Sequence, residues 1–173
     1  MTDQIQTRIA AHSFFAALTP QQRELLTGAA RPIRFAPRER IFAEGEAADR
    51  FWLIEAGSIA LDMWVPGRSG QIVETLPAGT VLGWSWLYPP YRWHFGACAR
   101  DRVEAIAFDA ATVRGRCEAD PAFGYAVFRS FIPVIIERLQ ATRLRLLDLY
   151  ASPDEAARSE ARRTEASNGG GPR

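Results

Sequence analysis

Lysine is missing from this chain, and cysteine and histidine are nearly so. All 21 basic residues are arginines, and the 173 residues include two cysteines and two histidines. Cys98 and Cys117 lack the spacing of a disulfide framework or a metal site. His12 and His94 are too few for a cupin-type metal centre, and no G-x-S-x-G elbow supports a nucleophilic triad. We therefore predict no metal site and no catalytic residue, and expect a protein that is not an enzyme.

Long hydrophobic runs and a strong net charge are absent too. No apolar stretch reaches membrane-spanning length, and residues 1–11 are polar, so neither a membrane anchor nor a signal peptide is expected. The net charge of +1 gives no bulk attraction to nucleic acid or to a membrane surface. With unpaired cysteines as well, the predicted location is the cytoplasm. The length suits one domain with a sizeable core.

The first two thirds of the chain predict a helix followed by many strands. Residues 12–29 are expected to be helical, because Thr19, Pro20 and Gln22 form a capping box with proline at the first helical position. Short runs of strand-forming residues follow, separated by turn signals, at 33–35, 40–42, 51–54, 59–65, 72–76 and 103–108. Short strands at near-regular spacing predict a small barrel or jelly roll.

From Pro121 the apolar period becomes helical. The apolar stripe consists of Phe128, Phe131, Ile132, Ile135, Leu139, Thr142, Leu146 and Leu149, with a second, partial stripe of Ile136, Leu144 and Leu147. Pro133 is expected to kink this helix or to begin a new one. The helix packs either on its own barrel or against a symmetry mate, and the second stripe favours a homodimer through residues 128–149.

Residues 151–173 contain no large apolar side chain and are expected to be a disordered tail. A helix-turn-helix needs roughly 26 residues with an apolar core, and this segment is shorter. We therefore expect no specific DNA binding by the chain alone.

The segment from Pro77 to Asp109 is the candidate site. Gly79 leads into an apolar pair and a second glycine, Gly83; a short aromatic segment follows, and Arg92 stands in an aromatic frame. Free N–H groups at a helix start and a guanidinium fork can converge on one phosphate.

The run at 39–59, ERIFAEGEAADRFWLIEAGSI, resembles the early strands of the Crp/Fnr-type cyclic-nucleotide-binding domain. That family has an apolar strand, an E-G-D/E turn, an aromatic-Leu-Ile strand and a closing turn with glycine in this order. The resemblance covers residues 15–150. It implies a mainly β fold with flanking α-helices, a jelly-roll β-barrel followed by a long dimerisation helix, within a domain at 12–150.

The same resemblance implies the site. In the family a glutamate that binds the ribose hydroxyl follows the glycine matching Gly83, whereas this chain has Trp84. Arg92 matches the phosphate-binding arginine most closely, although counting back from a return strand expected at 99–104 puts Trp93 at that position. The candidate ligand-binding residues are Gly83, Trp84, Ser85, Arg92, Trp93 and His94.

Alternatives stay open at each of these positions. Arg92 either holds a phosphate or stacks in solvent on Tyr91 or Trp93. The indoles of Trp84 and Trp86 either line a pocket or fill it. A cyclic nucleotide or another small anion is the candidate ligand, and no cofactor is assigned. The resemblance implies a regulatory or sensor module; the alternatives are a transcriptional regulator without its DNA-binding domain and a ligand-free dimeric scaffold.

Overall fold

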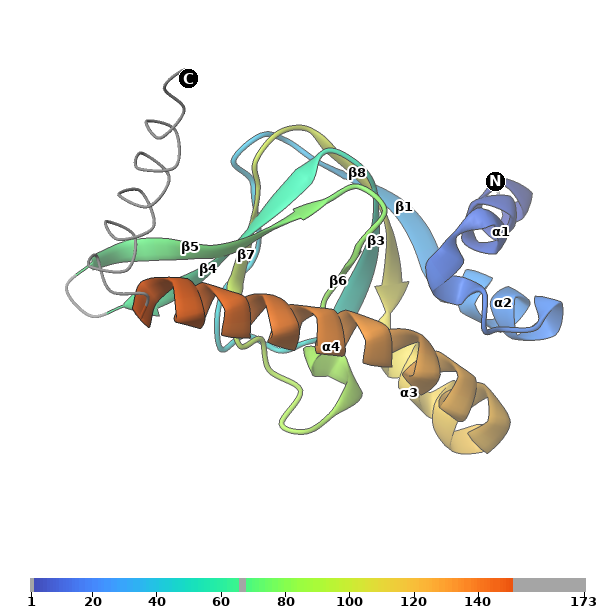
Figure 1. The fold of residues 1–173 in the computed structure, drawn as a ribbon. Coiled ribbons are helices and arrows are strands. Elements are labelled where there is room, and N and C mark those ends of the chain that lie inside the picture. Colours follow the sequence, from blue (N-terminus) through green and yellow to red (C-terminus); the bar gives the residue numbers. More distant parts are fainter. Residues whose placement is uncertain (1, 66–67, 151–173) are drawn as a thin grey trace, which may run out of the picture. The chain divides into compact units, whose positions relative to one another are not determined.

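Three short helices open the chain in the computed structural model, which describes residues 2–65 and 68–150 (Figure 1). They are α1 (Thr2–Ala11), the 3-10 helix η1 (Ser13–Phe15) and α2 (Pro20–Thr27). The capping box is confirmed, because the Thr19 hydroxyl accepts from the Gln22 N–H at 3.2 Å and the Gln22 side chain accepts from the Thr19 N–H at 3.0 Å. One continuous helix over 12–29 is wrong, and α1 was not predicted. Its Ile5 and Ile9 are buried in the core.

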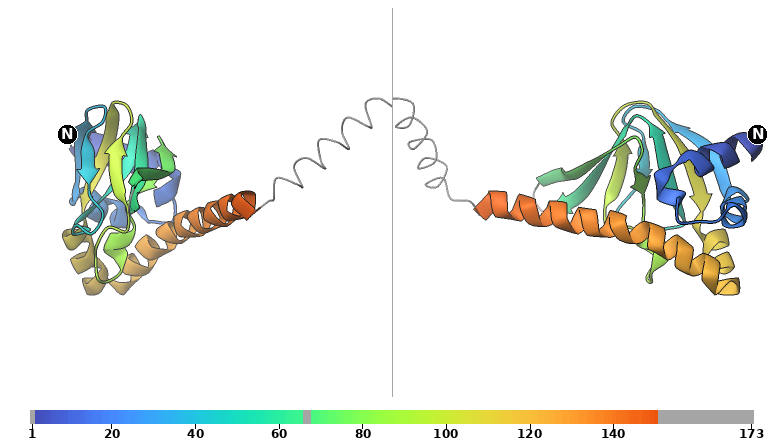
Figure 2. Two further views of the ribbon diagram at one scale, coloured as in Figure 1. Left: turned by 90° about the vertical axis from the view of Figure 1, so that its left-hand side faces the viewer. Right: turned by 45° about the vertical axis from the view of Figure 1, so that its right-hand side comes forward.

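Within the described residues, eight antiparallel strands form two four-stranded sheets, as expected for a jelly roll. They are β1 (Ala30–Phe35), β2 (Arg40–Phe42), β3 (Arg50–Ala56), β4 (Ser58–Val65), β5 (Arg68–Pro77), β6 (Val81–Leu82), β7 (Gly96–Ala99) and β8 (Val103–Asp109). The strand orders are β1-β8-β3-β6 and β2-β7-β4-β5. Figure 2 shows the sheets from two further sides, with α1 and α2 beside β1.

The return strand expected at 99–104 is not one strand. β7 ends at Ala99 and β8 begins at Val103. Between them, Asp101 accepts hydrogen bonds from the N–H and the hydroxyl of Ser58 at 2.7 and 2.9 Å, which fixes a turn. β7 therefore belongs to the sheet of β2 and β4, and β8 to the sheet of β1 and β3.

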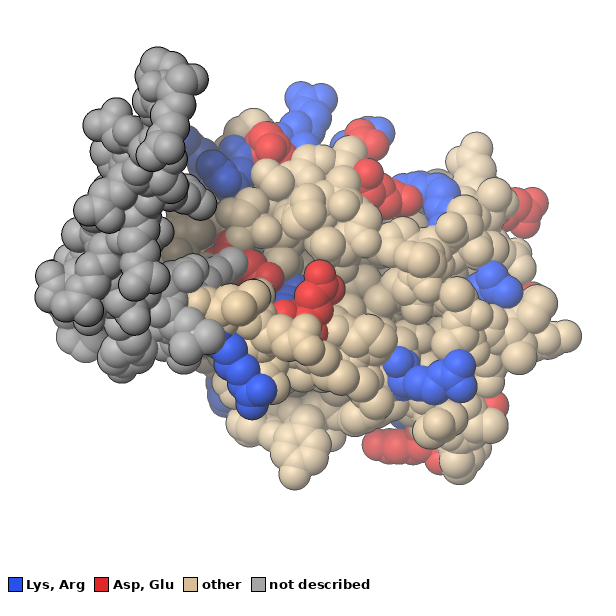
Figure 3. All heavy atoms as spheres, in the orientation of Figure 1, with Lys and Arg blue, Asp and Glu red and all other residues tan. Residues whose placement is uncertain are grey.

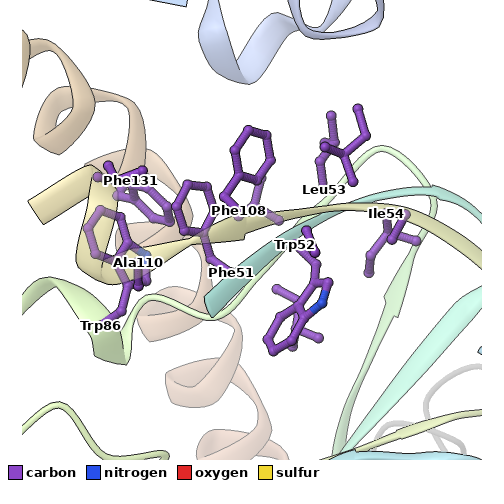
Figure 4. Packing of buried hydrophobic residues seen from close by; sticks show 14 of the residues in the cluster. Phe51, Trp52, Leu53, Ile54, Trp86, Phe108, Ala110 and Phe131 are labelled. Carbon is purple, nitrogen blue, oxygen red and sulfur yellow. The ribbon is translucent and has the colours of Figure 1, made fainter. Parts of the chain in front are cut away.

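Strand β3 divides the core into two halves, because its successive side chains point to opposite faces. Phe51 stacks on Phe108 at 4.5 Å and on Trp86 at 4.8 Å, toward the helices. Figure 4 shows this aromatic cluster with Phe131 of the last helix. Trp52 faces the other sheet, where it stacks on Phe42 of β2 at 5.5 Å.

Two helices close the described part of the chain. α3 (Ala110–Ala119) begins at the N-cap Asp109 and was not predicted. α4 (Pro121–Tyr150) runs unbroken through Pro133, so the alternative in which a new helix begins there is wrong. Residues up to Val134 form one compact unit, and the rest of α4 belongs to a second unit that starts at Ile135.

In the first unit α4 has two apolar faces. Phe123, Val127 and Phe131 are buried in the core, whereas Phe128 and Ile132 are 47% and 45% exposed. The side chains of Leu146, Leu147 and Leu149, and the tail expected at 151–173, lie outside the described residues.

Candidate functional site

Gly83 is the turning point of the candidate site. It follows β6 with a φ of +89°, a region that favours glycine, and leads into the 3-10 helix η2 (Ser85–Leu87). Ser85 and Trp86 are buried there, and Trp84 is half-buried. η2 has a single turn and no side-chain cap, so it offers a phosphate little of a helix N-terminus.

A short backbone ladder decides which side chains of the following segment face inward. The Trp93 N–H donates to the Glu46 carbonyl and the Gly45 N–H donates to the Trp93 carbonyl, both at 2.9 Å. The Ala48 N–H donates to the Tyr91 carbonyl at 2.7 Å. Exchanging inward and outward side chains would need a one-residue slip that breaks all three hydrogen bonds.

With this register Trp93 lies inside the barrel. Its ring is 4% exposed and stacks on Phe42 with the ring centroids 4.0 Å apart. Trp52 lies 5.8 Å from it in a tilted arrangement. A Cβ at Gly83 would sit 2.9 Å from the Trp93 ring, so the indole lies against bare backbone. Trp93 thus fills the space beside Gly83.

Arg92 points the other way. Its Nη1 donates to the carbonyl oxygen of Gly45 at 2.7 Å, and the residue is exposed. His94 is exposed as well, and its ring centroid lies 5.9 Å from that of Trp84. Four of the six predicted residues therefore form two pairs, Gly83 with Trp93 and Trp84 with His94. Arg92 bonds to Gly45, and Ser85 is buried in η2.

Sequence reasoning missed three residues of this site. Phe42 and Trp52 complete the stack around Trp93, and they come from strands distant in sequence. Arg114 of α3 holds the loop from the other side: its Nη1 donates to the Trp86 carbonyl at 3.1 Å, and its guanidinium lies 4.5 Å from the Tyr91 ring centroid. The arginine that stacks on Tyr91 is thus Arg114 and not Arg92. Because α3 was not predicted, no signal pointed to it.

Within residues 2–65 and 68–150, no three His, Cys, Asp or Glu side chains are grouped so that they could hold a metal ion. Burial raises the pKa of the Cys117 thiol, which is opposite to what a nucleophilic cysteine needs. Figure 3 shows basic and acidic side chains interspersed over one face, without a large patch of one sign.

In the described part of the chain, no helix is both long enough and apolar enough to cross a bilayer.

Comparison with known proteins places these features in a family. The sequence profile of the cyclic nucleotide-binding domain matches residues 32–120, just over half of the chain. The chain is 23% identical over 141 residues to the CRP-like cAMP-activated global transcriptional regulator of Mycobacterium tuberculosis, covering 82% of this chain and 61% of that protein. It therefore spans less than two thirds of that relative's length.

Solved structures agree on the fold. A putative cyclic nucleotide-binding protein from Geobacter metallireducens aligns with a TM-score of 0.70 and 25% identity, over 78% of this chain and 97% of that one. A cyclic nucleotide-binding domain from Methylobacillus flagellatus aligns with a TM-score of 0.71 and 14% identity, over 85% and 83%. The jelly roll and the glycine turn before η2 agree with the profile match. This chain therefore belongs to the cyclic nucleotide-binding domain family, with the fold of the regulatory domain of Crp-like proteins.

Proposed function

We propose that this chain is a cytoplasmic, non-enzymatic regulatory module, at 12–150, whose nucleotide position is filled by its own Trp93. The observation that supports the proposal is the contact between the Trp93 ring and the Gly83 backbone, beside the glycine that the family resemblance matches to its phosphate pocket. Cyclic AMP is expected to bind weakly at best.

Charge supports the proposal as much as volume does. The inward position carries an indole instead of a guanidinium, so a phosphate placed there would lose its counter-charge. Burying an ion without a partner is far costlier than burying a paired one. Trp84 in place of the family's glutamate also leaves the ribose hydroxyl without its acceptor, at a cost of roughly 1–3 kcal/mol.

Any small anion that the domain does bind would be held by Arg92. Its guanidinium is exposed and has five N–H donors, of which one bonds to Gly45. A phosphate could take a bidentate pair of the others from outside the barrel. Ser85 and His94 are the remaining candidate contacts, and they stay proposals.

We propose that the module transmits its regulatory signal through α4, which binds a second copy of the chain. Tyr125, Phe128 and Ile132 place exposed apolar side chains along one face of the helix, which the chain's own core does not use. A DNA-binding partner domain, as in a transcriptional regulator, would receive this signal. The second candidate function is a ligand-free dimeric scaffold, because Trp93 already occupies the site.

Calorimetric titration with cyclic AMP and cyclic GMP tests the occupied site. The wild type should show no binding tighter than about millimolar. The double variant Trp84→Glu with Trp93→Arg restores the family's carboxylate and guanidinium, and should bind at least about tenfold more tightly. Trp64→Arg, which makes the same exchange at an indole that is 69% exposed, is the matched control and should change nothing.

Two results would overturn the proposal. One is micromolar binding of either nucleotide by the wild type. The other is a double variant that folds, as judged by circular dichroism, and still binds no better than the control. If the double variant does not fold, Trp93→Arg alone removes the ring and supplies the counter-charge, and an affinity no better than that of the control would also contradict the proposal. Titration of phosphate into the wild type and Arg92→Ala tests the anion separately.

A further inference from the structure

His12 lies between α1 and η1, close to the turn between β5 and β6. It is the N-cap of η1, and its Nδ1 accepts a hydrogen bond from the Phe14 N–H at 3.1 Å. The imidazole also interacts with the backbone of Gly79, in the turn between β5 and β6. One ring therefore connects the end of α1 with the turn that leads to Gly83.

The residues that His12 caps contact α4 at Phe131. Phe14 packs edge-on against Phe131, with the ring centroids 4.8 Å apart, and Phe15 lies 5.6 Å from Phe108. Figure 4 shows Phe131 and Phe108 in the same aromatic cluster as Phe51 and Trp86. The conformation of η1 is thus coupled by direct contact to the core that supports α4.

The cap requires a neutral ring. An unprotonated Nδ1 is an acceptor, whereas in the imidazolium both nitrogens are donors, so protonation would turn the Nδ1 hydrogen toward the Phe14 N–H. The capping hydrogen bond would then be lost and two donors would face each other.

Charged neighbours do not offset this loss. Arg8 on α1 is paired with Glu55 at the end of β3, and Arg23 on α2 donates to the Ala10 carbonyl at 3.2 Å. The turn at 77–79 contributes no ionisable side chain. The carboxylate of Glu55 is already held by Arg8 with two hydrogen bonds.

We propose that His12 is a proton-operated latch, which when neutral caps η1 and so holds Phe14 against Phe131 of α4, and which releases η1 when protonated while the ring keeps its contact with the Gly79 backbone. Partial burial is in agreement with this, since it lowers the pKa of His12 below its ordinary value. The folded state then favours the neutral ring, so the latch stabilises the fold fully above about pH 6.5. This stabilisation is lost as the pH falls below that value toward the lowered pKa.

Proton NMR across about pH 5 to pH 8 tests the latch directly, because the chain has only two histidines and His94→Asn assigns both. The Phe14 amide shift and the Phe131 ring shifts should follow the titration curve of His12. The urea midpoint of unfolding should fall over the same interval. In His12→Asn, whose amide oxygen can cap η1 without binding a proton, both responses should disappear while the midpoint at high pH is kept.

His94→Asn is the matched control and should keep the whole pH response. The proposal is overturned if the Phe14 amide ignores the His12 titration, or if His12→Asn retains the wild-type response. If His12→Asn fails to fold, the shifts of the wild type alone decide, because they report on the unaltered chain.

Discussion

At the scale of single residues, Gly83 and Trp93 depend on each other. The indole can lie against the backbone only because residue 83 has no Cβ, and the turn needs its positive φ. Which of Arg92 and Trp93 faces inward could not be settled from the sequence. It follows from the pairing of 91–93 with 45–48, a contact between segments far apart in the chain.

Replacing Gly83 with alanine should therefore destabilise the protein by two effects, a strained φ and a methyl group forced into the Trp93 ring. Gly45→Ala is the control for the first effect, because Gly45 has a φ of +82° and its Cβ would meet nothing within 4 Å. We expect Gly83→Ala to cost about 1–3 kcal/mol more than Gly45→Ala in urea unfolding. Equal losses would show that the ring does not press on residue 83.

At the scale of elements, local signals were predictable and distant ones were not. The capping box of α2 is contained in four consecutive residues and is confirmed. α1 has only Ile5 and Ile9 as buried apolar residues, too few for a period to be recognised. Residues 96–109 divide into two strands of different sheets at a turn that Asp101 fixes by its hydrogen bond with Ser58. The residues around Asp101 do not predict this distant contact.

α3 offers a test of an element that the sequence did not predict. Its N-cap Asp109 accepts from the Thr112 N–H at 2.7 Å, and hydrogen bonds from the Thr112 hydroxyl and N–H lower the pKa of this carboxyl. Asp109→Ala should cost about 1 kcal/mol, and Asp109→Asn much less.

The acid response of the same cap follows from the sign of the pKa change. A lowered pKa means that the cap stabilises the fold above about pH 3.9 and that this stabilisation is lost as the pH falls further. Thermal unfolding of the three proteins at neutral pH and at about pH 3 measures both effects. An alanine variant as stable as wild type at neutral pH would contradict the assigned cap.

At the scale of the whole molecule, the family and the jelly roll were predictable because the early strands carry their own motifs. The assembly is the part that stays a prediction. Phe128, Ile132, Ile135, Leu139, Thr142, Leu146 and Leu149 recur at alternating steps of four and three, the heptad spacing of a two-stranded coiled coil. Of these, Phe128, Ile132 and Leu139 are among the exposed large hydrophobic residues.

We expect a homodimer in solution, and expect Ile132→Glu with Leu139→Glu to convert it to monomers, because two carboxylates would face their copies across the seam. Gln140→Glu adds a charge at an exposed position off the seam and should leave the dimer intact. Light scattering coupled to size exclusion gives the mass of each. A monomeric wild type would contradict the expectation.

The ladder between 45–48 and 91–93 also determines which side chains would face inward if the chain were shortened by one residue. Because side chains alternate across the ladder, removing the single residue 93 would bring one of its two neighbours, Arg92 or His94, into the inward position without a change to any other residue. Deletion of one codon here would thus exchange a barrel filled by an indole for one that presents a nitrogen-bearing side chain to its interior. Point substitutions reach the same state only by replacing the side chain itself.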